Sequence, residues 1–198
     1  MKTLQAFPRG TVLHFVRHGA TAANLVGLRC GGDLDLPLTD TGRRQAQSAG
    51  RALLARRAPI SHIVTSDLQR TRETATLIAG MLGSSQALPT LVVEHRFAER
   101  RLGDWNLTPT ADTEVALRMG LVPPGGEDGE EFHDRIVAAL ECIRPLLAQS
   151  VLMVGSKGVA RVLGELSGLP GRLALDNGVL CSFQLGPRFQ EQPDLETT

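Results

Sequence analysis

The sequence predicts an α/β fold, arranged as a three-layer α/β/α sandwich with a mostly parallel sheet. Strand-like and helix-like segments alternate along the chain, which is the order expected of a parallel sheet covered by helices on both faces. The strand-like segments are short apolar runs, as expected of strands that are buried in such a sheet. The loops between segments are mostly short, and the chain has no internal repeat. We therefore expect one domain over residues 1–185 and a mobile polar tail over residues 186–198.

The first half of the chain contains two predicted strands, each followed by a helix. The first strand is predicted over residues 11–16, where β-branched and bulky apolar side chains are concentrated. Thr39 can cap the first long helix, and the second strand is predicted over residues 62–65. Ser66 and Gln69 have the spacing of a capping box, which predicts that the next helix opens there. The apolar stripe of that helix consists of Leu68, Ala75, Ile78 and Leu82.

The second half begins with a segment that is predicted to be irregular, from Glu94 to about Gly126. A long amphipathic helix follows, with apolar residues at Phe132, Ile136, Leu140, Ile143 and Leu147. Pro145 should kink this helix or end it early, because proline cannot donate a backbone hydrogen bond. A last helix contains Val159, Val162 and Leu163. The remaining strands are predicted over residues 91–93, 151–155 and 179–185.

Composition favours a soluble cytoplasmic domain. The 21 basic residues balance 21 acidic ones, so no overall charge favours a nucleic-acid or membrane partner, and an anion site must be a local cluster. The three cysteines lie far apart without a C-x-x-C pair, which argues against disulfides and zinc. The first residues lack the apolar core of a signal peptide, and no run reaches membrane-spanning length. The sequence leaves the oligomeric state open.

The segment Arg17-His18-Gly19 follows the first predicted strand directly. It places a cation and an imidazole at the carboxyl end of a strand, where open α/β sheets hold their ligands. Histidine can attack phosphorus as a nucleophile, and a neighbouring guanidinium can hold phosphoryl oxygens with two hydrogen bonds. Three residues alone make a weak motif.

Four segments in order resemble the histidine phosphatase (phosphoglycerate mutase-like) superfamily. Residues 17–24 resemble its opening R-H-G-x-T-x-x-N, and residues 35–42 its D-x-x-L-T-x-x-G helix entry. Residues 66–75 are similar to its S-x-L-x-R-A-x-x-T-A helix, and residues 99–105 to its E-x-x-x-G-x-W segment. The resemblance covers most of the chain and implies a phosphoglycerate mutase-like fold and a phosphorylated small-molecule substrate.

The resemblance also implies roles for individual residues. His18 would carry the phosphoryl group, and Arg17 and Arg70 would clamp it, because charge in phosphoryl transfer spreads over several oxygens. Asn24 would be a neutral donor to the same phosphate. Glu99 would protonate the leaving oxygen, which requires a raised pKa near neutral pH. No metal or other cofactor is implied.

The resemblance further places Cys30 and Gly31 in a loop that lines the substrate, although an inert thiol at Cys30 is an equal alternative. One departure concerns a late segment in which the superfamily has a second histidine. The aligned run here places Ser156 at that position. Losing one such donor costs about 3–4 kcal/mol, or roughly 10²–10³ in rate. Lys157 could supply the missing cation or could be a surface lysine.

Two functions from different classes remain open at this point. Retention of His18, Arg17, Arg70 and Glu99 favours phosphomonoester hydrolysis through a phosphohistidine, weakened or specialised by Ser156. The alternative is an impaired relative that binds a phosphorylated ligand or partner. A phosphoglycerate-type mutase is less favoured, because such relatives are usually longer. A haloacid-dehalogenase-like nucleophile at Asp33 does not fit, since no buried strand precedes it.

Overall fold

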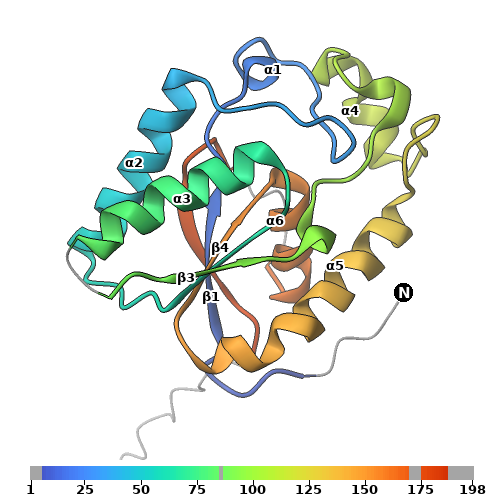
Figure 1. Ribbon diagram of the computed structural model, residues 1–198. Helices are drawn as coiled ribbons and strands as arrows, with labels where there is room; N and C mark the ends of the chain where they lie inside the picture. The colour runs from blue at the N-terminus through green and yellow to red at the C-terminus, as the bar shows by residue number, and fades with distance from the viewer. Residues whose placement is uncertain (1–5, 85–86, 170–174, 187–198) are drawn as a thin grey trace, which may run out of the picture.

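The computed structural model describes residues 6–84, 87–169 and 175–186. Within these residues one five-stranded sheet has the order β3-β2-β4-β1-β5 (Figure 1). The pairs β2–β3, β2–β4 and β1–β4 are parallel, and only β5 runs antiparallel to its neighbour. The α/β fold with a mostly parallel sheet is therefore confirmed. The strands are β1 (Val12–Arg17), β2 (His62–Thr65), β3 (Thr90–Val93), β4 (Val151–Gly155) and β5 (Leu180–Gln184).

Helices cover both faces of the sheet, with α2 and α3 on one side and α5 and α6 on the other (Figure 1). The α-helices are α1 (Ala22–Leu25), α2 (Asp40–Ala55), α3 (Gln69–Gly83), α4 (Thr110–Arg118), α5 (Gly129–Ile143) and α6 (Lys157–Leu166). Three 3₁₀ helices within the described residues are η1 (His95–Phe97), η2 (Gly103–Trp105) and η3 (Arg144–Ala148). No described helix has the length and apolar character that crossing a bilayer requires.

Alternating side chains of the central strands supply the two halves of the core. Val16, Leu152 and Val154 pack with α2 and α3. Phe15 and Met153 pack with Phe132 and other residues of α5 and α6. Each is fully buried, and burying such a side chain contributes about 1.5–3 kcal/mol. The double burial of β1 and β4 explains why both strands are recognisable as apolar runs in the sequence.

The predicted strands agree with the structure to within one residue at each end. Thr39 caps α2 as predicted, because its hydroxyl accepts a hydrogen bond from the Gly42 amide at 3.1 Å. The capping box at Ser66 is wrong. Helix α3 begins at Gln69 after an N-cap without a side-chain hydrogen bond, and the Gln69 amide donates instead to Asp35 Oδ1 at 2.8 Å. A tertiary contact has replaced the local one.

Pro145 has the predicted effect, since α5 ends at Ile143 and the chain continues as η3. The prediction that residues 94–126 are irregular is wrong in part, because this segment contains η1, η2 and the nine-residue helix α4. Only Thr113 of α4 is buried, so the helix has no apolar stripe that the sequence could reveal. Most of the predicted tail, residues 187–198, lies outside the described part of the chain.

Candidate active site

His18 follows the last residue of β1, and its backbone amide donates to the Gly155 carbonyl at 2.9 Å. The imidazole is 4% exposed, and its Nδ1 lies 2.8 Å from the Gly19 carbonyl oxygen. A carbonyl can only accept, so Nδ1 carries the proton and Nε2 keeps its lone pair. Burial, followed by the charges of Arg70 and Arg17, holds the pKa of His18 well below its usual value of 6.5. The ring is therefore neutral at pH 7.

The turn after His18 is closed by direct backbone packing against the start of α2. A Cβ atom at Gly19 would lie 2.2 Å from the Gly42 carbonyl oxygen. A Cβ at Gly42 would lie 2.3 Å from the carbonyl oxygen of Ala20. Both contacts are with backbone, which cannot move aside as a side chain can. Glycine at these two positions lets α2 pack against the loop that carries the imidazole.

Two guanidinium groups lie near this ring, that of half-buried Arg17 and that of fully buried Arg70. Arg17 donates through Nη1 to the Leu175 carbonyl at 2.7 Å. Arg70 is 0% exposed and donates to the carbonyls of Leu34 at 2.8 Å and Gly31 at 3.0 Å. The Nε atoms of both are buried without a hydrogen-bond partner. Neither guanidinium forms an ion pair within the described residues. Guanidinium groups that form no ion pair and keep unused donors favour an anionic ligand.

Glu99 approaches the same site from the segment between η1 and η2. Its Oε1 accepts from the Arg100 amide at 2.7 Å, and its Oε2 accepts from the Gly158 amide at 2.9 Å. Gly158 belongs to the first turn of α6, and a Cβ there would lie 2.1 Å from Glu99 Oε1. The charge of Glu99 acts to raise the pKa of Arg17, although burial dominates and lowers that pKa overall. The carboxylate thus sits between the start of α6 and Arg17.

Asn24 is oriented by its side-chain oxygen, which accepts from the Thr21 amide at 3.1 Å in a capping box of α1. Asn177, which sequence analysis missed, completes this arrangement. Its Nδ2 donates to the His18 carbonyl at 2.9 Å and to Asn24 Oδ1 at 3.3 Å. With its oxygen engaged in this way, the Asn24 amide group presents its nitrogen end as the remaining donor. Asn177 carries no sequence motif that could have revealed it.

Ser156 lies directly after β4, next to Gly155, which is the register partner of Arg17. It is 2% exposed, and its hydroxyl oxygen has no hydrogen-bond partner in the described structure. Lys157 is the first residue of α6 and is exposed. The pKa of Glu114 in α4 is lowered mainly by a hydrogen bond from Arg29, and the charge of Lys157 adds to this effect. Lys157 therefore lies within electrostatic range of α4.

Cys30 and Gly31 lie in the loop whose carbonyls Arg70 holds. Burial raises the pKa of the Cys30 thiol, although the charge of Arg70 opposes this shift, and the sulfur lies 3.7 Å from the Leu34 carbonyl oxygen. A neutral thiol is a weak nucleophile, so the structure favours no chemistry at Cys30. The Gly31 amide donates to Asn106 Oδ1 at 2.7 Å. This loop is therefore tied both to Arg70 and to the segment after Glu99.

Asp33 makes a second set of hydrogen bonds between the loop at Cys30 and the segment after Glu99. Its Oδ1 accepts from the Leu102 amide at 3.0 Å and from Asn106 Nδ2 at 2.9 Å, and its Oδ2 accepts from the Gly103 amide at 2.7 Å. Burial acts to raise the pKa of Asp33, but these hydrogen bonds outweigh burial and lower it. Both oxygens of the Asp33 carboxylate are thus engaged in joining the two segments.

We expect Asp33 to make folding stability depend on pH. Its folded pKa lies below the usual value of 3.8, so its contribution is fully present above pH 3.8 and is lost as the pH falls through the lower folded value. The free energy of unfolding of the wild type, relative to Asp33→Asn, should therefore decrease below about pH 3.8. Urea unfolding of both proteins across this range measures the difference. A difference that stays constant with pH would contradict the assignment.

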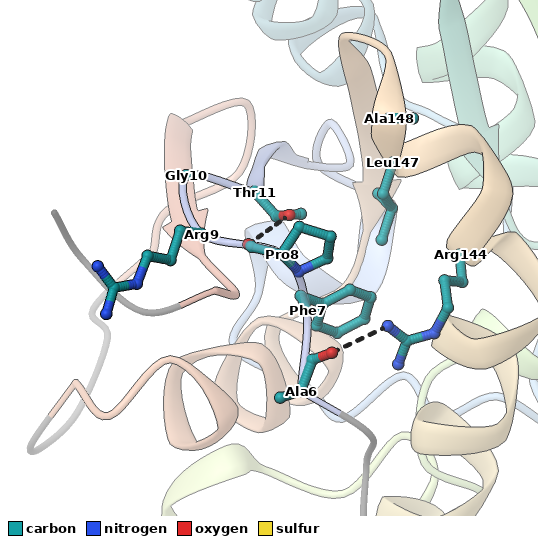
Figure 2. A pocket seen from close by; sticks show the side chains of 9 residues that line it. All are labelled: Ala6, Phe7, Pro8, Arg9, Gly10, Thr11, Arg144, Leu147 and Ala148. Atoms are coloured by element: carbon teal, nitrogen blue, oxygen red, sulfur yellow. Dashed lines mark hydrogen bonds between the residues drawn. The ribbon is translucent and has the colours of Figure 1, made fainter.

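A cavity of about 670 Å³ lies at the end of the strands opposite to His18, and the segments that lead into β1 and β4 line it (Figure 2). There the guanidinium carbon of Arg144 lies 4.1 Å from the Phe7 ring centre, and Nη1 donates to the Ala6 carbonyl at 3.4 Å. The Thr11 hydroxyl donates to the Pro8 carbonyl at 2.9 Å. This cavity contains no imidazole or carboxylate, so its chemistry does not compete with that around His18. The described residues also contain no cluster of three or more histidine, cysteine, aspartate or glutamate side chains suited to a metal ion.

Comparison with known proteins gives the family. The model of the histidine phosphatase superfamily (branch 1) matches residues 13–186, which is most of the chain. The chain belongs to this superfamily. Its relatives include the protein named "Probable phosphoglycerate mutase GpmB" of Klebsiella pneumoniae (strain 342). The two are 35% identical over 181 residues, a match that covers 83% of this chain and 80% of the relative.

Solved structures of similar proteins confirm the phosphoglycerate mutase-like fold. The product of open reading frame Rv3214 of Mycobacterium tuberculosis has a TM-score of 0.72 and 27% identity, covering 88% of this chain and 91% of that one. A protein from Thermus thermophilus, TTHB049, has a TM-score of 0.68 and 29% identity, covering 86% and 92%. The alpha-ribazole phosphatase from Shigella flexneri has a TM-score of 0.69 and covers 86% and 89%. At 23% identity, this last likeness concerns the fold alone.

Proposed function

We propose that the protein hydrolyses phosphomonoesters of small molecules through a phosphohistidine intermediate on His18. The observation that carries this proposal is a neutral, buried imidazole with Nε2 unprotonated, placed near the guanidinium groups of Arg17 and Arg70, which form no ion pair within the described residues. A nucleophile needs its lone pair, and a phosphate dianion needs fixed positive charge. Both requirements are met at one edge of the sheet.

The first step transfers the phosphoryl group to the protein. Arg17 and Arg70 bind the phosphoryl oxygens, and Asn24 adds a neutral donor. Nε2 of His18 attacks phosphorus, and the bond between phosphorus and the leaving oxygen breaks. The leaving oxygen takes a proton from the Glu99 carboxyl group. This role requires the Glu99 carboxyl group to hold a proton at the moment of phosphoryl transfer.

The second step returns the protein to its starting state. A water molecule attacks phosphorus and loses a proton to Glu99, and the bond between phosphorus and Nε2 breaks as inorganic phosphate forms. Steady-state release of phosphate from a panel of phosphorylated metabolites and p-nitrophenyl phosphate tests the whole sequence. We expect activity in EDTA, because the charge comes from arginines, together with an acid-labile phosphoryl-protein. Activity that EDTA abolishes and a divalent cation restores would refute the proposal.

A second candidate function is a binding module for phosphorylated ligands, which Ser156 favours. Its small hydroxyl stands where the resemblance to the superfamily expects an imidazole. If this substitution limits catalysis, Ser156→His should raise turnover by up to roughly 10²-fold, because it restores a donor aimed at the developing charge. Phosphate release by wild type and variant measures this gain.

Lys157→Ala shows whether Lys157 has replaced the missing cation. A sharp loss of activity or of phosphate affinity would assign that role to Lys157. If Lys157 is only a surface lysine, its removal should leave both nearly unchanged. Inactive wild type and inactive Ser156→His on every phosphomonoester would favour the binding module instead. Phosphate transfer to a second acceptor, in place of release to water, would favour a mutase, the activity named for the Klebsiella pneumoniae relative.

A further inference from the structure

Arg135 of α5 forms hydrogen bonds with the backbone that carries Glu99. Nη1 of Arg135 donates to the carbonyls of Arg96 at 2.6 Å and Ala98 at 3.0 Å, and Nη2 donates to the Glu99 carbonyl at 3.2 Å. Residues 98–102 have no helix or strand of their own to fix them. One guanidinium group therefore binds three backbone oxygens at and just before the proposed proton donor.

Arg135 is itself fixed by a buried carboxylate. Glu127 is 1% exposed and forms an ion pair with Arg135 through Nη2, with a further hydrogen bond from Arg135 Nε at 3.3 Å. Its Oε1 also accepts from the Arg101 amide at 3.1 Å. The Glu127 carbonyl accepts from Arg100 Nε at 2.9 Å. Glu127 thus binds Arg135 and the two residues after Glu99.

We propose that Arg135 and Glu127 form a positioning pair that sets the orientation of the Glu99 carboxylate. The inference rests on the proposed function, in which Glu99 moves a proton. The pair fixes the chain on both sides of Glu99, while the Arg100 and Gly158 amides fix the carboxylate itself. Displacing a catalytic group by about 1 Å costs on the order of 10²-fold in rate.

Arginine is required at this position by geometry as well as by charge. Its planar group donates in several fixed directions, and here it serves three carbonyls of one backbone segment and both oxygens of Glu127. A lysine ammonium is a single nitrogen on a flexible stem and can keep the ion pair without holding all three carbonyls. Arg135→Lys therefore separates positioning from charge.

The leaving group of the substrate provides the readout. An alkyl phosphate releases a strongly basic alkoxide and needs the proton from Glu99, whereas p-nitrophenyl phosphate releases a stable phenolate. Arg135→Lys should lower kcat/KM, which reports phosphoryl transfer to His18 and not the later hydrolysis that all substrates share, by roughly 10- to 100-fold for an alkyl phosphate and by only a few fold for p-nitrophenyl phosphate. Glu99→Gln should give the same pattern with a larger amplitude. An equal loss on both substrates, or no loss, would overturn the proposal.

Arg144→Lys is the matched control, because Arg144 also pairs with a glutamate, Glu141, but at the far end of α5. Its activity on both substrates should match the wild type. Urea unfolding of all variants identifies any loss that comes from instability, and Glu127→Gln, which keeps the side-chain shape, should reproduce the leaving-group pattern of Arg135→Lys.

Amide hydrogen exchange tests the positioning pair without any turnover. Arg135→Lys should speed exchange at the Arg100 and Gly158 amides, which donate to Glu99, and Arg144→Lys should not. Unchanged exchange at both amides would overturn the inference even in an active enzyme. Failure of the proposed function has a different signature, which is the absence of a phosphoryl-protein and of phosphate release in the wild type.

Discussion

His18→Ala should abolish phosphate release and the acid-labile phosphoryl-protein together. The substitution removes the only group that the proposal uses as a nucleophile, while the guanidinium groups of Arg17 and Arg70 stay in place. Loss of a nucleophile in a hydrolase lowers kcat by on the order of 10⁴- to 10⁶-fold. Steady-state kinetics and the intact mass of protein quenched during turnover measure the two effects.

Phosphate binding should survive in His18→Ala, because the guanidinium groups of Arg17 and Arg70 remain. His62→Ala provides the control, since His62 lies at the amino end of β2, away from the site, and its loss should leave activity at the wild-type level. A His18→Ala protein that still hydrolyses phosphomonoesters would place the nucleophile elsewhere. If that variant still forms a phosphoryl-protein, the nucleophile also lies elsewhere, even when turnover is reduced.

Arg70→Lys should lower kcat/KM by roughly 10³-fold, at the lower end of the effect of arginines that stabilise phosphoryl transfer. The guanidinium already uses Nη1 and Nη2 to hold the carbonyls of Leu34 and Gly31, and its buried Nε has no partner. A lysine has one nitrogen and cannot hold the loop and a phosphate at once. Inhibition by inorganic phosphate should weaken in parallel.

Arg72→Lys is the matched control, because Arg72 lies on the same helix and is exposed. Its effect on kcat/KM should be negligible. Urea unfolding distinguishes a lost phosphate contact from a loosened loop, since the second also lowers the free energy of unfolding. If Arg70→Lys leaves kcat/KM as unchanged as Arg72→Lys does, the anion site does not include Arg70.

The sequence predicts the sheet well because its signals are local. β1 and β4 are continuous apolar runs, as expected of strands that are covered on both faces. The structure brings Arg17 into electrostatic range of His18, Arg70 and Glu99, and His18 into range of Arg70. The catalytic roles of these residues stay predictions until the variants are measured.

What the sequence could not reveal depends on contacts between distant segments. Asn177 and His18 are separated by most of the chain, and their hydrogen bond follows no spacing rule. Arg135 and Glu127 look like ordinary charges near the start of an amphipathic helix, although Glu127 is buried. The capping box at Ser66 failed for the same reason, since Asp35 supplies the acceptor from another segment.

The strand order also sets when the site can form during synthesis. Strand β1, which carries His18 at its end, is flanked by β4 and β5, and both neighbours leave the ribosome late. At about 5–20 residues per second, β1 waits on the order of ten seconds for β4 to emerge. Until then its apolar residues have no partner strand, although β2 and β3 can already pair. A nascent chain stalled before Val151 would therefore leave the apolar residues of β1 without a partner strand, a condition that favours aggregation.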